Sequence, residues 1–453
     1  MQPTAMIPAR IDPPAQPLSL LPLLRAMVRN PIESWPRAVY REHLHRSRMP
    51  GRDAVFVMWP SLIRQVLVDD ADSFEKGAMA RRALGPVLGD AILIAEGARW
   101  RAQRRATAPL FRREQLLDFL PVMIAAAERT RDRWLSYPVA SEIDVAREMM
   151  RTTLDIVLAT MLSASGADDP ARIERAIAEY LESTSWVMAL TILGAPRWVP
   201  YPGVRKAARA RDFLKQFVAG LTSGIAYREP GPCNDLLSLL IGANDPQTGH
   251  SMSETDVREN ILTFVMAGHE TTALALTWTF YLLGLHPEIE ERVRSENATI
   301  TGGTPVQGEH IDSLRYTQQV IQEAMRLYPP APLIVREARR VLQLGTETVG
   351  PGTFVYVPVY AIHRHEEFWD RPDLFDPDRF APEAIKTRDR YVYLPFGAGP
   401  RICIGMSFAQ MEATAVLAVL LSSLRLRLRP DYTPQPKLRI TLRPAGGMPM
   451  RLG

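Results

Sequence analysis

One cysteine lies where its chemistry and its surroundings suit a metal ligand. Cys403 falls within the stretch FGAGPRICIG, residues 396–405, whose glycines allow a tight loop close to a flat ligand. An apolar helix is expected directly after it, and the free N–H groups at a helix N-terminus lower the pKa of a thiol. A lone cysteine serves as a ligand when the metal's other ligands come from elsewhere, as in haem. We therefore predict that Cys403 binds a haem iron; the alternative is a buried structural cysteine, which is our interpretation of Cys233.

A carboxylate and a hydroxyl lie side by side in an apolar segment. Glu270 and Thr271 follow Gly268 near the middle of residues 261–285. A threonine hydroxyl beside a carboxylate can organise water and relay protons, and the glycine lets a small ligand approach the backbone. A zinc site of the HExxH type is excluded because its last position is Ala273. The alternative is a polar pair with a structural role only.

These groups need a long helix to hold them. The charge near the centre of residues 261–285 favours a buried helix over a membrane span, since a central charge costs roughly 2.5–3.5 kcal/mol on insertion. We expect this helix to begin with a capping box of Ser251 and Glu254 and to end at His286-Pro287. The last helix is expected at about 404–424.

The apolar pattern predicts a mainly helical protein with a minor β region. Most of residues 99–285 have helical spacing, and residues 330–362 have strand and turn character. The first 36 residues are rich in proline, and we expect residues 1–36 to form an extended arm in front of a single domain at 37–453. Apolar residues make up 46% of the 453, which is enough for a large core.

Composition excludes several classes of protein. The net charge is only +4 and the basic residues are dispersed, which is not the pattern of a nucleic-acid binder. Two cysteines cannot make a disulfide framework. The N-terminal residues have no charged region followed by an apolar one, so no secretory signal and no membrane span are predicted. We expect a cytoplasmic protein.

The stretch FGAGPRICIG resembles the cysteine-loop signature of the cytochrome P450 family, FGxGxRxCxG, at every fixed position. The resemblance extends over nearly the whole chain, and it implies that 37–453 form one catalytic domain of this family. It implies the cytochrome P450 fold, with haem buried between a long central helix and the helix after the cysteine loop. The implied cofactor is haem b, held without covalent attachment because a CxxCH motif is absent, and the co-substrate is O2.

Further motifs carry the same resemblance. Trp100 and Arg104 are similar to the family's WxxxR, whose members contact the haem propionates, and Arg336 and Arg401 fall at further propionate positions. The implied cofactor-binding residues are Cys403, Trp100, Arg104, Arg336, Phe396, Gly397 and Arg401. The stretch AGHETT, residues 267–272, implies three catalytic residues: Gly268, Glu270 as the proton feed, and Thr271 beside the bound oxygen.

Two more motifs imply a buried structural cluster. Glu323 and Arg326 match the family's ExxR, and Arg379 lies in Pro377-Asp-Arg-Phe380, similar to PERF with Asp in place of the commoner Glu. The resemblance implies that Glu323, Arg326 and Arg379 lock the cysteine loop. Read alone, the Glu–Arg spacing is that of an ordinary surface pair.

The substrate and the electron donor are expected from family position. The implied substrate pocket is apolar and the substrate small and apolar; the pocket residues are Ile92, Leu93, Val187, Leu190, Ala267, Leu333, Ile334 and Val335. Electrons are expected from a separate ferredoxin or flavodoxin with a reductase, because only 50 residues follow Cys403. A basic run could dock an acidic partner: Arg99, Arg101, Arg104, Arg105, Arg112 and Arg113.

The leading hypothesis is a monooxygenase that inserts one atom of O2 into its substrate. Three alternatives remain: a haem-thiolate peroxygenase, a haem protein that senses or carries a small ligand, and a helical scaffold. The Glu270–Thr271 pair argues against the first two, and the Cys403 loop has no purpose in the third.

Overall fold

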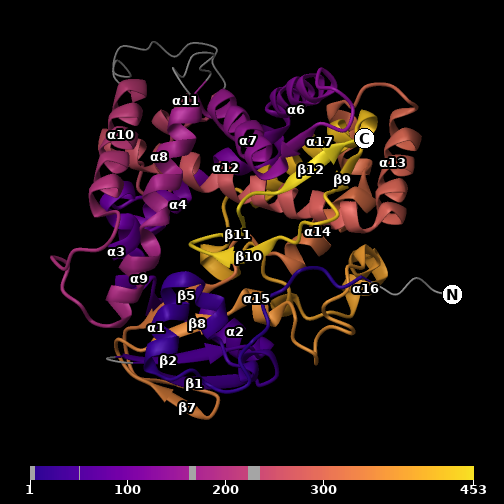
Figure 1. Ribbon diagram of the computed structural model, residues 1–453. Helices are drawn as coiled ribbons and strands as arrows, with labels where there is room; N and C mark the ends of the chain where they lie inside the picture. The colour runs from indigo at the N-terminus through magenta and orange to yellow at the C-terminus, as the bar shows by residue number, and fades with distance from the viewer. Residues whose placement is uncertain (1–5, 50–51, 163–169, 223–234) are drawn as a thin grey trace.

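The five-stranded sheet lies at one end of the molecule and most helices lie at the other, as Figure 1 shows. The computed structural model describes residues 6–49, 52–162, 170–222 and 235–453. The β10–β11 hairpin lies between these two regions (Figure 1). The predicted fold class, mainly α with a minor β region, is confirmed.

Helices form the larger part of the described chain. Their bounds are α1 (Leu20–Arg29), α2 (Pro60–Arg64), α3 (Gly77–Leu88), α4 (Gly97–Thr107), α5 (Arg113–Leu117), α6 (Leu120–Leu135), α7 (Val145–Leu162), α8 (Pro170–Glu182), α9 (Thr184–Ile192), α10 (Val204–Thr222), α11 (Leu236–Ile241), α12 (Glu254–Leu285), α13 (Pro287–Thr301), α14 (Arg315–Leu327), α15 (Val359–Ile362), α16 (Pro382–Lys386) and α17 (Met406–Ser423).

Four sheets are present among the described residues. The largest has the order β1-β2-β8-β5-β3, in which β2 and β8 are parallel and the other neighbours antiparallel. The others are β4-β12-β9, β10-β11 and β6-β7. Strand bounds are β1 (Leu44–Met49), β2 (Arg52–Val57), β3 (Phe74–Glu75), β4 (Glu142–Asp144), β5 (Ile334–Ala338), β6 (Leu342–Leu344), β7 (Glu347–Val349), β8 (Phe354–Val357), β9 (Leu426–Leu428), β10 (Gln435–Leu438), β11 (Leu442–Ala445) and β12 (Pro449–Leu452).

Helix α12 is the central element of the core. Its 32 residues extend about 48 Å at 1.5 Å per residue, and it packs against α7, α14 and α17. The expected capping box of Ser251 and Glu254 is wrong by two residues: Ser253 accepts from the Asp256 N–H, and the Asp256 carboxylate bonds back to the Ser253 N–H. Ser251 instead bonds to Asn244, with which it forms an isolated bridge.

The N-terminal segment departs from the expected extended arm. Helix α1 forms within it because a face of the segment that includes Ala26 and Met27 can be buried, partly against α9. Among the described residues before this helix, Ala9 and Ile11 are held by three tyrosine hydroxyls. Tyr281 accepts from the Ala9 N–H at 3.0 Å, Tyr360 accepts from the Ile11 N–H at 3.2 Å, and Tyr328 donates to the Ala9 carbonyl at 2.5 Å.

Among the described residues, one helix is long and apolar enough to cross a membrane by length and composition. This helix is α17, and 67% of it is buried inside the protein. A core helix passes the same test, and α17 packs against α6, α12, α13 and α14.

Candidate active site

A large internal cavity separates α12 from the cysteine loop. Its volume is about 550 Å³, and Cys403 lines one wall while Ala267, Gly268 and Thr271 line the opposite one. Almost all of α12 around these three residues is buried, so their exposure is to the cavity. The two motifs, more than 130 positions apart in the chain, therefore face the same space.

Backbone contacts fix the cysteine loop. The Cys403 N–H donates to the Phe396 carbonyl at 2.9 Å, and the Ile402 N–H donates to the Gly399 carbonyl at 3.0 Å. Gly399 has φ +72°, and a Cβ there would lie 1.9 Å from the Leu67 carbonyl oxygen. Only glycine fits that position, because both the conformation and the space exclude a side chain.

The thiol of Cys403 is exposed to the cavity and lies just before α17. Burial raises the pKa of Cys403, while the Gly405 N–H and the charges of Arg104 and Lys76 lower it. The sulfur thus has a hydrogen-bond donor and two cations at hand that stabilise the thiolate form. A metal bound at the sulfur would add the charge that completes deprotonation.

Four cations gather at the same end of the cavity. Arg104, Arg336, Arg401 and Lys76 all line it, and the Arg401 guanidinium lies 4.4 Å over the ring of Trp100. Arg401 also bonds to Glu96 and to the Ala95 carbonyl. Lys76 and Glu96 were not identified from the sequence, because neither belongs to a recognised motif.

One of these cations has a carboxylate partner, because Arg401 pairs with Glu96, but Arg104 and Arg336 have none among the described residues. In the part of the chain that the structure describes, no carboxylate forms an ion pair with Arg104 or Arg336. Burial and the charge of Arg401 lower the pKa of Arg336 to about 10. Burial and the charges of Arg336 and Arg401 lower the pKa of Lys76 to about 7. The cluster therefore requires an external anion.

A haem fits this arrangement. Its flat ring matches an apolar cavity, its iron requires the one thiol on the wall, and its two propionates supply the anions that the cations lack. Cys403, Phe396 and Gly397 would border the ring, and Arg104, Arg336, Arg401 and Lys76 would bind the propionates. Trp100 lines the same end.

Thr271 and Glu270 occupy different environments. Thr271 lines the cavity, and its hydroxyl donates to the Ala267 carbonyl at 2.8 Å. The Glu270 carboxylate does not line the cavity. It is buried against the β10–β11 hairpin, where the Thr441 hydroxyl donates to it and Arg443 Nε donates at 2.7 Å. The acid and the hydroxyl are therefore adjacent in the chain but have different surroundings, and only the hydroxyl belongs to a residue that lines the cavity.

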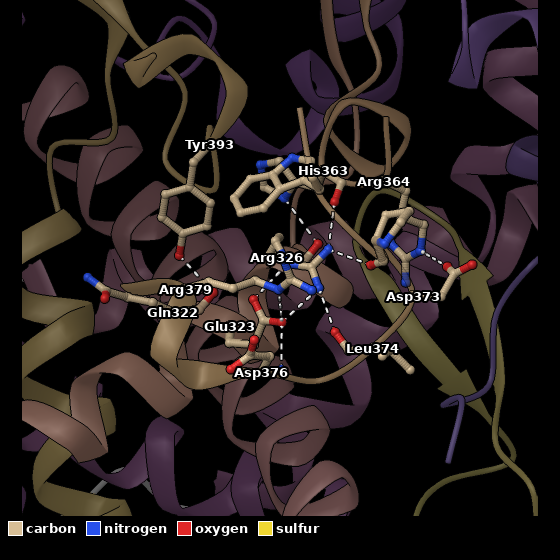
Figure 2. Close-up of polar contacts among 12 residues, drawn as sticks. Gln322, Glu323, Arg326, His363, Arg364, Asp373, Leu374, Asp376, Arg379 and Tyr393 are labelled. Carbon is tan, nitrogen blue, oxygen red and sulfur yellow. Dashed lines mark hydrogen bonds and ion pairs between the residues drawn. The ribbon is translucent and has the colours of Figure 1, made fainter. Parts of the chain in front are cut away.

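The predicted cluster of Glu323, Arg326 and Arg379 is present, as Figure 2 shows. Arg326 Nε and Nη2 donate to the two oxygens of Glu323 at 2.6 and 2.7 Å, and both side chains are fully buried. Arg326 also donates to three carbonyls, those of His363, Pro372 and Leu374. All five donors of this guanidinium are thereby satisfied. Arg379 lies 3.5 Å from Glu323.

His363 connects this cluster to the cysteine loop. Its Nδ1 lies 3.1 Å from the Arg326 carbonyl, and its Nε2 accepts from the Leu394 N–H at 2.8 Å. The ring stacks on Tyr393, whose hydroxyl donates to the Gln322 carbonyl. Leu394 in turn accepts from the Gly397 N–H at the start of the loop. Positions 393–397 are thus held against α14 by the buried His363 imidazole and by the Tyr393 hydroxyl.

Apolar side chains line the rest of the cavity. Six of the eight predicted pocket residues lie on its wall, namely Ile92, Leu93, Ala267, Leu333, Ile334 and Val335. Val187 and Leu190 do not. In α9 the cavity is lined instead by Met188, Ala189 and Ile192. Helix α9 is mostly apolar and has no charged residue, so the sequence contains no strongly polar face from which to infer its orientation.

The fold and the site together define a haem-thiolate protein. The family model of cytochrome P450 matches residues 13–448, and the chain belongs to the cytochrome P450 family. The chain is similar to a solved structure, the cytochrome P450DA haem domain, with a TM-score of 0.78 and 26% identity. That match covers 91% of this chain and 90% of the other.

Relatives that are named for an activity include bacterial enzymes. The chain is 31% identical to cyclooctatin synthase of Streptomyces melanosporofaciens, over 93% of this chain and 92% of the relative. It is 31% identical to pentalenene oxygenase of Streptomyces avermitilis, over 93% and 95%. The protein is a cytochrome P450 monooxygenase, an oxidoreductase that uses haem b and O2 and takes electrons from a redox partner.

Proposed function

We propose that the enzyme inserts one oxygen atom from O2 into a small apolar organic substrate that binds above the face of the haem opposite Cys403. The observation that carries this proposal is the single cavity shared by Cys403, Thr271 and an apolar wall. Two relatives are named for the oxidation of pentalenene and of cyclooctat-9-en-7-ol, which supports an apolar substrate.

The site residues have the following proposed roles. Haem, when bound, supplies the activation of O2. Cys403 would ligate the haem iron, and Gly268 leaves space beside α12 for a small ligand. The Thr271 hydroxyl is the polar donor on the substrate side, where it can hold a water molecule or pass a proton.

Glu270 has a proposed role behind this wall. Because its carboxylate is held by Thr441 and Arg443, it can take part in proton supply only when one of those bonds opens. We propose that Glu270 holds a proton path at the β11 side of α12 and passes protons toward Thr271 through water.

The electron donor is proposed to be a separate ferredoxin or flavodoxin with its reductase, in the cytoplasm. The basic run in and after α4 is a weaker docking site than its sequence indicates. Four of its six arginines, Arg99, Arg101, Arg105 and Arg113, pair with carboxylates, and Arg104 lines the cavity. Arg112 therefore remains as the candidate contact, and a reduction rate that does not change with ionic strength would count against electrostatic docking.

Spectroscopy and turnover test the proposed function together. The reduced, carbon monoxide-bound protein should show the strongly red-shifted Soret band of thiolate-ligated haem, and the protein should oxidise an apolar substrate when a ferredoxin, its reductase and NADPH are supplied. Cys403→Ala should abolish both, whereas Cys233→Ala should change neither. A normal spectrum in Cys403→Ala would remove Cys403 from the site.

A further inference from the structure

One cation in the cavity is not explained by haem. Arg439 lies in the turn between β10 and β11 and lines the same cavity as Cys403. The charges that act on it are those of Glu182 and Arg443. None of the four cations at the Cys403 end is among them, so Arg439 lies apart from the propionate cluster.

The guanidinium of Arg439 is held from one side only. Its Nη1 donates to the carbonyls of Val28 and Arg29 at the end of α1, at 3.1 and 3.2 Å, and to the Ser185 hydroxyl at 3.0 Å. Within the described ranges, no acceptor takes a hydrogen bond from Nε or Nη2, and no carboxylate forms an ion pair with this residue. The partners of Arg439 are thus neutral, and two of its nitrogens remain without one.

The free edge has the geometry of a carboxylate site. Nε and Nη2 lie on one edge of a guanidinium and bind the two oxygens of a carboxylate side by side. The same edge is used twice elsewhere in this protein, by Arg326 on Glu323 and by Arg105 on Asp245. In Arg439 no carboxylate of the described residues binds this edge of the guanidinium.

The lining of the cavity favours an external anion. Its charged residues are all cationic: Lys76, Arg104, Arg336, Arg401 and Arg439. The two propionates of haem, together with Glu96, would balance the charges of the four cations at the Cys403 end. Burial lowers the pKa of Arg439, because its charge is partly removed from water. No ion pair with a carboxylate of the described residues compensates for this desolvation. The wall between the two cationic ends is apolar, with Met188, Phe264 and Leu333 among its members.

We infer that Arg439 binds a carboxylate of the substrate, so that the substrate class of this enzyme is an apolar carboxylic acid with its hydrocarbon body directed toward Cys403. This inference rests on the proposed function and refines its substrate. Ser185 and the end of α1 act as the support that fixes the guanidinium, and Arg439 determines specificity without taking part in the oxidation.

Binding of matched acids and alcohols tests the inference. Isothermal titration calorimetry on the haem-loaded enzyme would compare dodecanoate with dodecanol, and adamantanecarboxylate with adamantanemethanol. In the wild type at least one acid should bind about tenfold or more tightly than its alcohol, since a paired, charge-assisted contact is added. Arg439→Gln should abolish that preference and leave the affinity for the alcohol unchanged.

Two further variants separate binding from structure. Lys437→Gln removes a positive charge two residues before Arg439, in β10, at a residue that does not line the cavity, and it should keep the acid preference. Arg439→Lys keeps the charge but loses the paired donors, so its acid preference should be intermediate; it also serves if Arg439→Gln does not fold. An equal preference for acid in wild type and Arg439→Gln, or no acid preference in the wild type, would overturn the inference.

The carbon monoxide spectrum distinguishes this inference from the proposed function. A wild type without the thiolate spectrum contradicts the proposed function whatever the calorimetry shows. A wild type with that spectrum and with equal affinity for acids and alcohols contradicts only the role of Arg439.

Discussion

Glu270 of α12 and Arg443 of β11 form an ion pair that joins this long central helix to the β10–β11 hairpin. Arg443 Nε lies 2.7 Å from Glu270 Oε1, and the carboxylate is buried while the guanidinium is partly exposed. The pair neutralises a charge in the middle of a helix that is otherwise buried. It therefore contributes to stability as well as to the proposed proton path.

Removal of Arg443 leaves the Glu270 charge buried without its partner. Arg443→Gln should lower the free energy of unfolding by about 2–3 kcal/mol, because a buried charge then lacks compensation. The double variant with Glu270→Gln should lose less than the sum of the two single losses. Chemical denaturation of all four proteins measures this coupling, and strict additivity would show that the pair is energetically unimportant.

Loss of the Thr271 hydroxyl should separate electron use from product formation. Thr271→Ala should consume NADPH at a similar rate but yield several-fold less product and more hydrogen peroxide, because the polar donor of the substrate side is gone. Thr277→Ala is the matched control, since Thr277 makes the same bond to a carbonyl four residues earlier but is buried away from the cavity. Unchanged coupling in Thr271→Ala would remove Thr271 from the mechanism.

Arg326 should tolerate no replacement. Arg326→Lys keeps the charge but loses most of five hydrogen bonds, and it should destabilise the protein by about 3 kcal/mol or more and reduce haem retention. Arg292→Lys is the control, because Arg292 pairs with Asp378 at the surface, where such a change costs under about 1 kcal/mol. Equal thermal midpoints for the two variants would contradict the assigned role of the cluster.

Stability should fall at acid pH through His363. Burial, and then the charge of Arg326, lowers the pKa of His363 to about 3, against about 6.5 in the unfolded chain. The folded state therefore resists a proton that the unfolded state accepts, so stability is full above about pH 6.5 and is lost as the pH falls toward 3. The loss reaches about 1.4 kcal/mol per pH unit for this one group.

Non-titrating variants test that assignment. His363→Gln should be less stable at pH 7 but should lose less stability between pH 7 and pH 5 than the wild type does, as measured by urea denaturation. His250→Gln, at an exposed position, should follow the wild type. An identical pH dependence in wild type and His363→Gln would assign the acid loss to other groups.

Short motifs made most of the active site predictable. Cys403 and Thr271 each lie in a stretch where local sequence determines local geometry, and the cluster around Arg326 needs only two such stretches. Lys76, Arg439 and Arg443 could not be found in this way. Each meets its partners through tertiary contacts across more than 100 residues or lies outside any motif, so local spacing contains no signal for it.

Two errors have physical causes of the same kind. Val187 and Leu190 were placed on the cavity wall, but α9 presents Met188, Ala189 and Ile192, because a mostly apolar helix without charged residues has no preferred face until its neighbours are known. The capping box of α12 was placed two residues early, since Ser251 and Ser253 both precede an acidic residue by three positions and only the bridge of Ser251 to Asn244 separates them.

The close approach of Gly399 to the Leu67 carbonyl has a consequence for engineering. At Gly399 backbone packs on backbone, so this position offers no side chain to exchange and no room for one. The cavity itself is lined by apolar side chains such as Met188 and Leu333, which can be exchanged for others of similar volume. Libraries that randomise these apolar side chains should therefore return folded enzymes with altered product profiles, whereas libraries at Gly399 should return protein without haem.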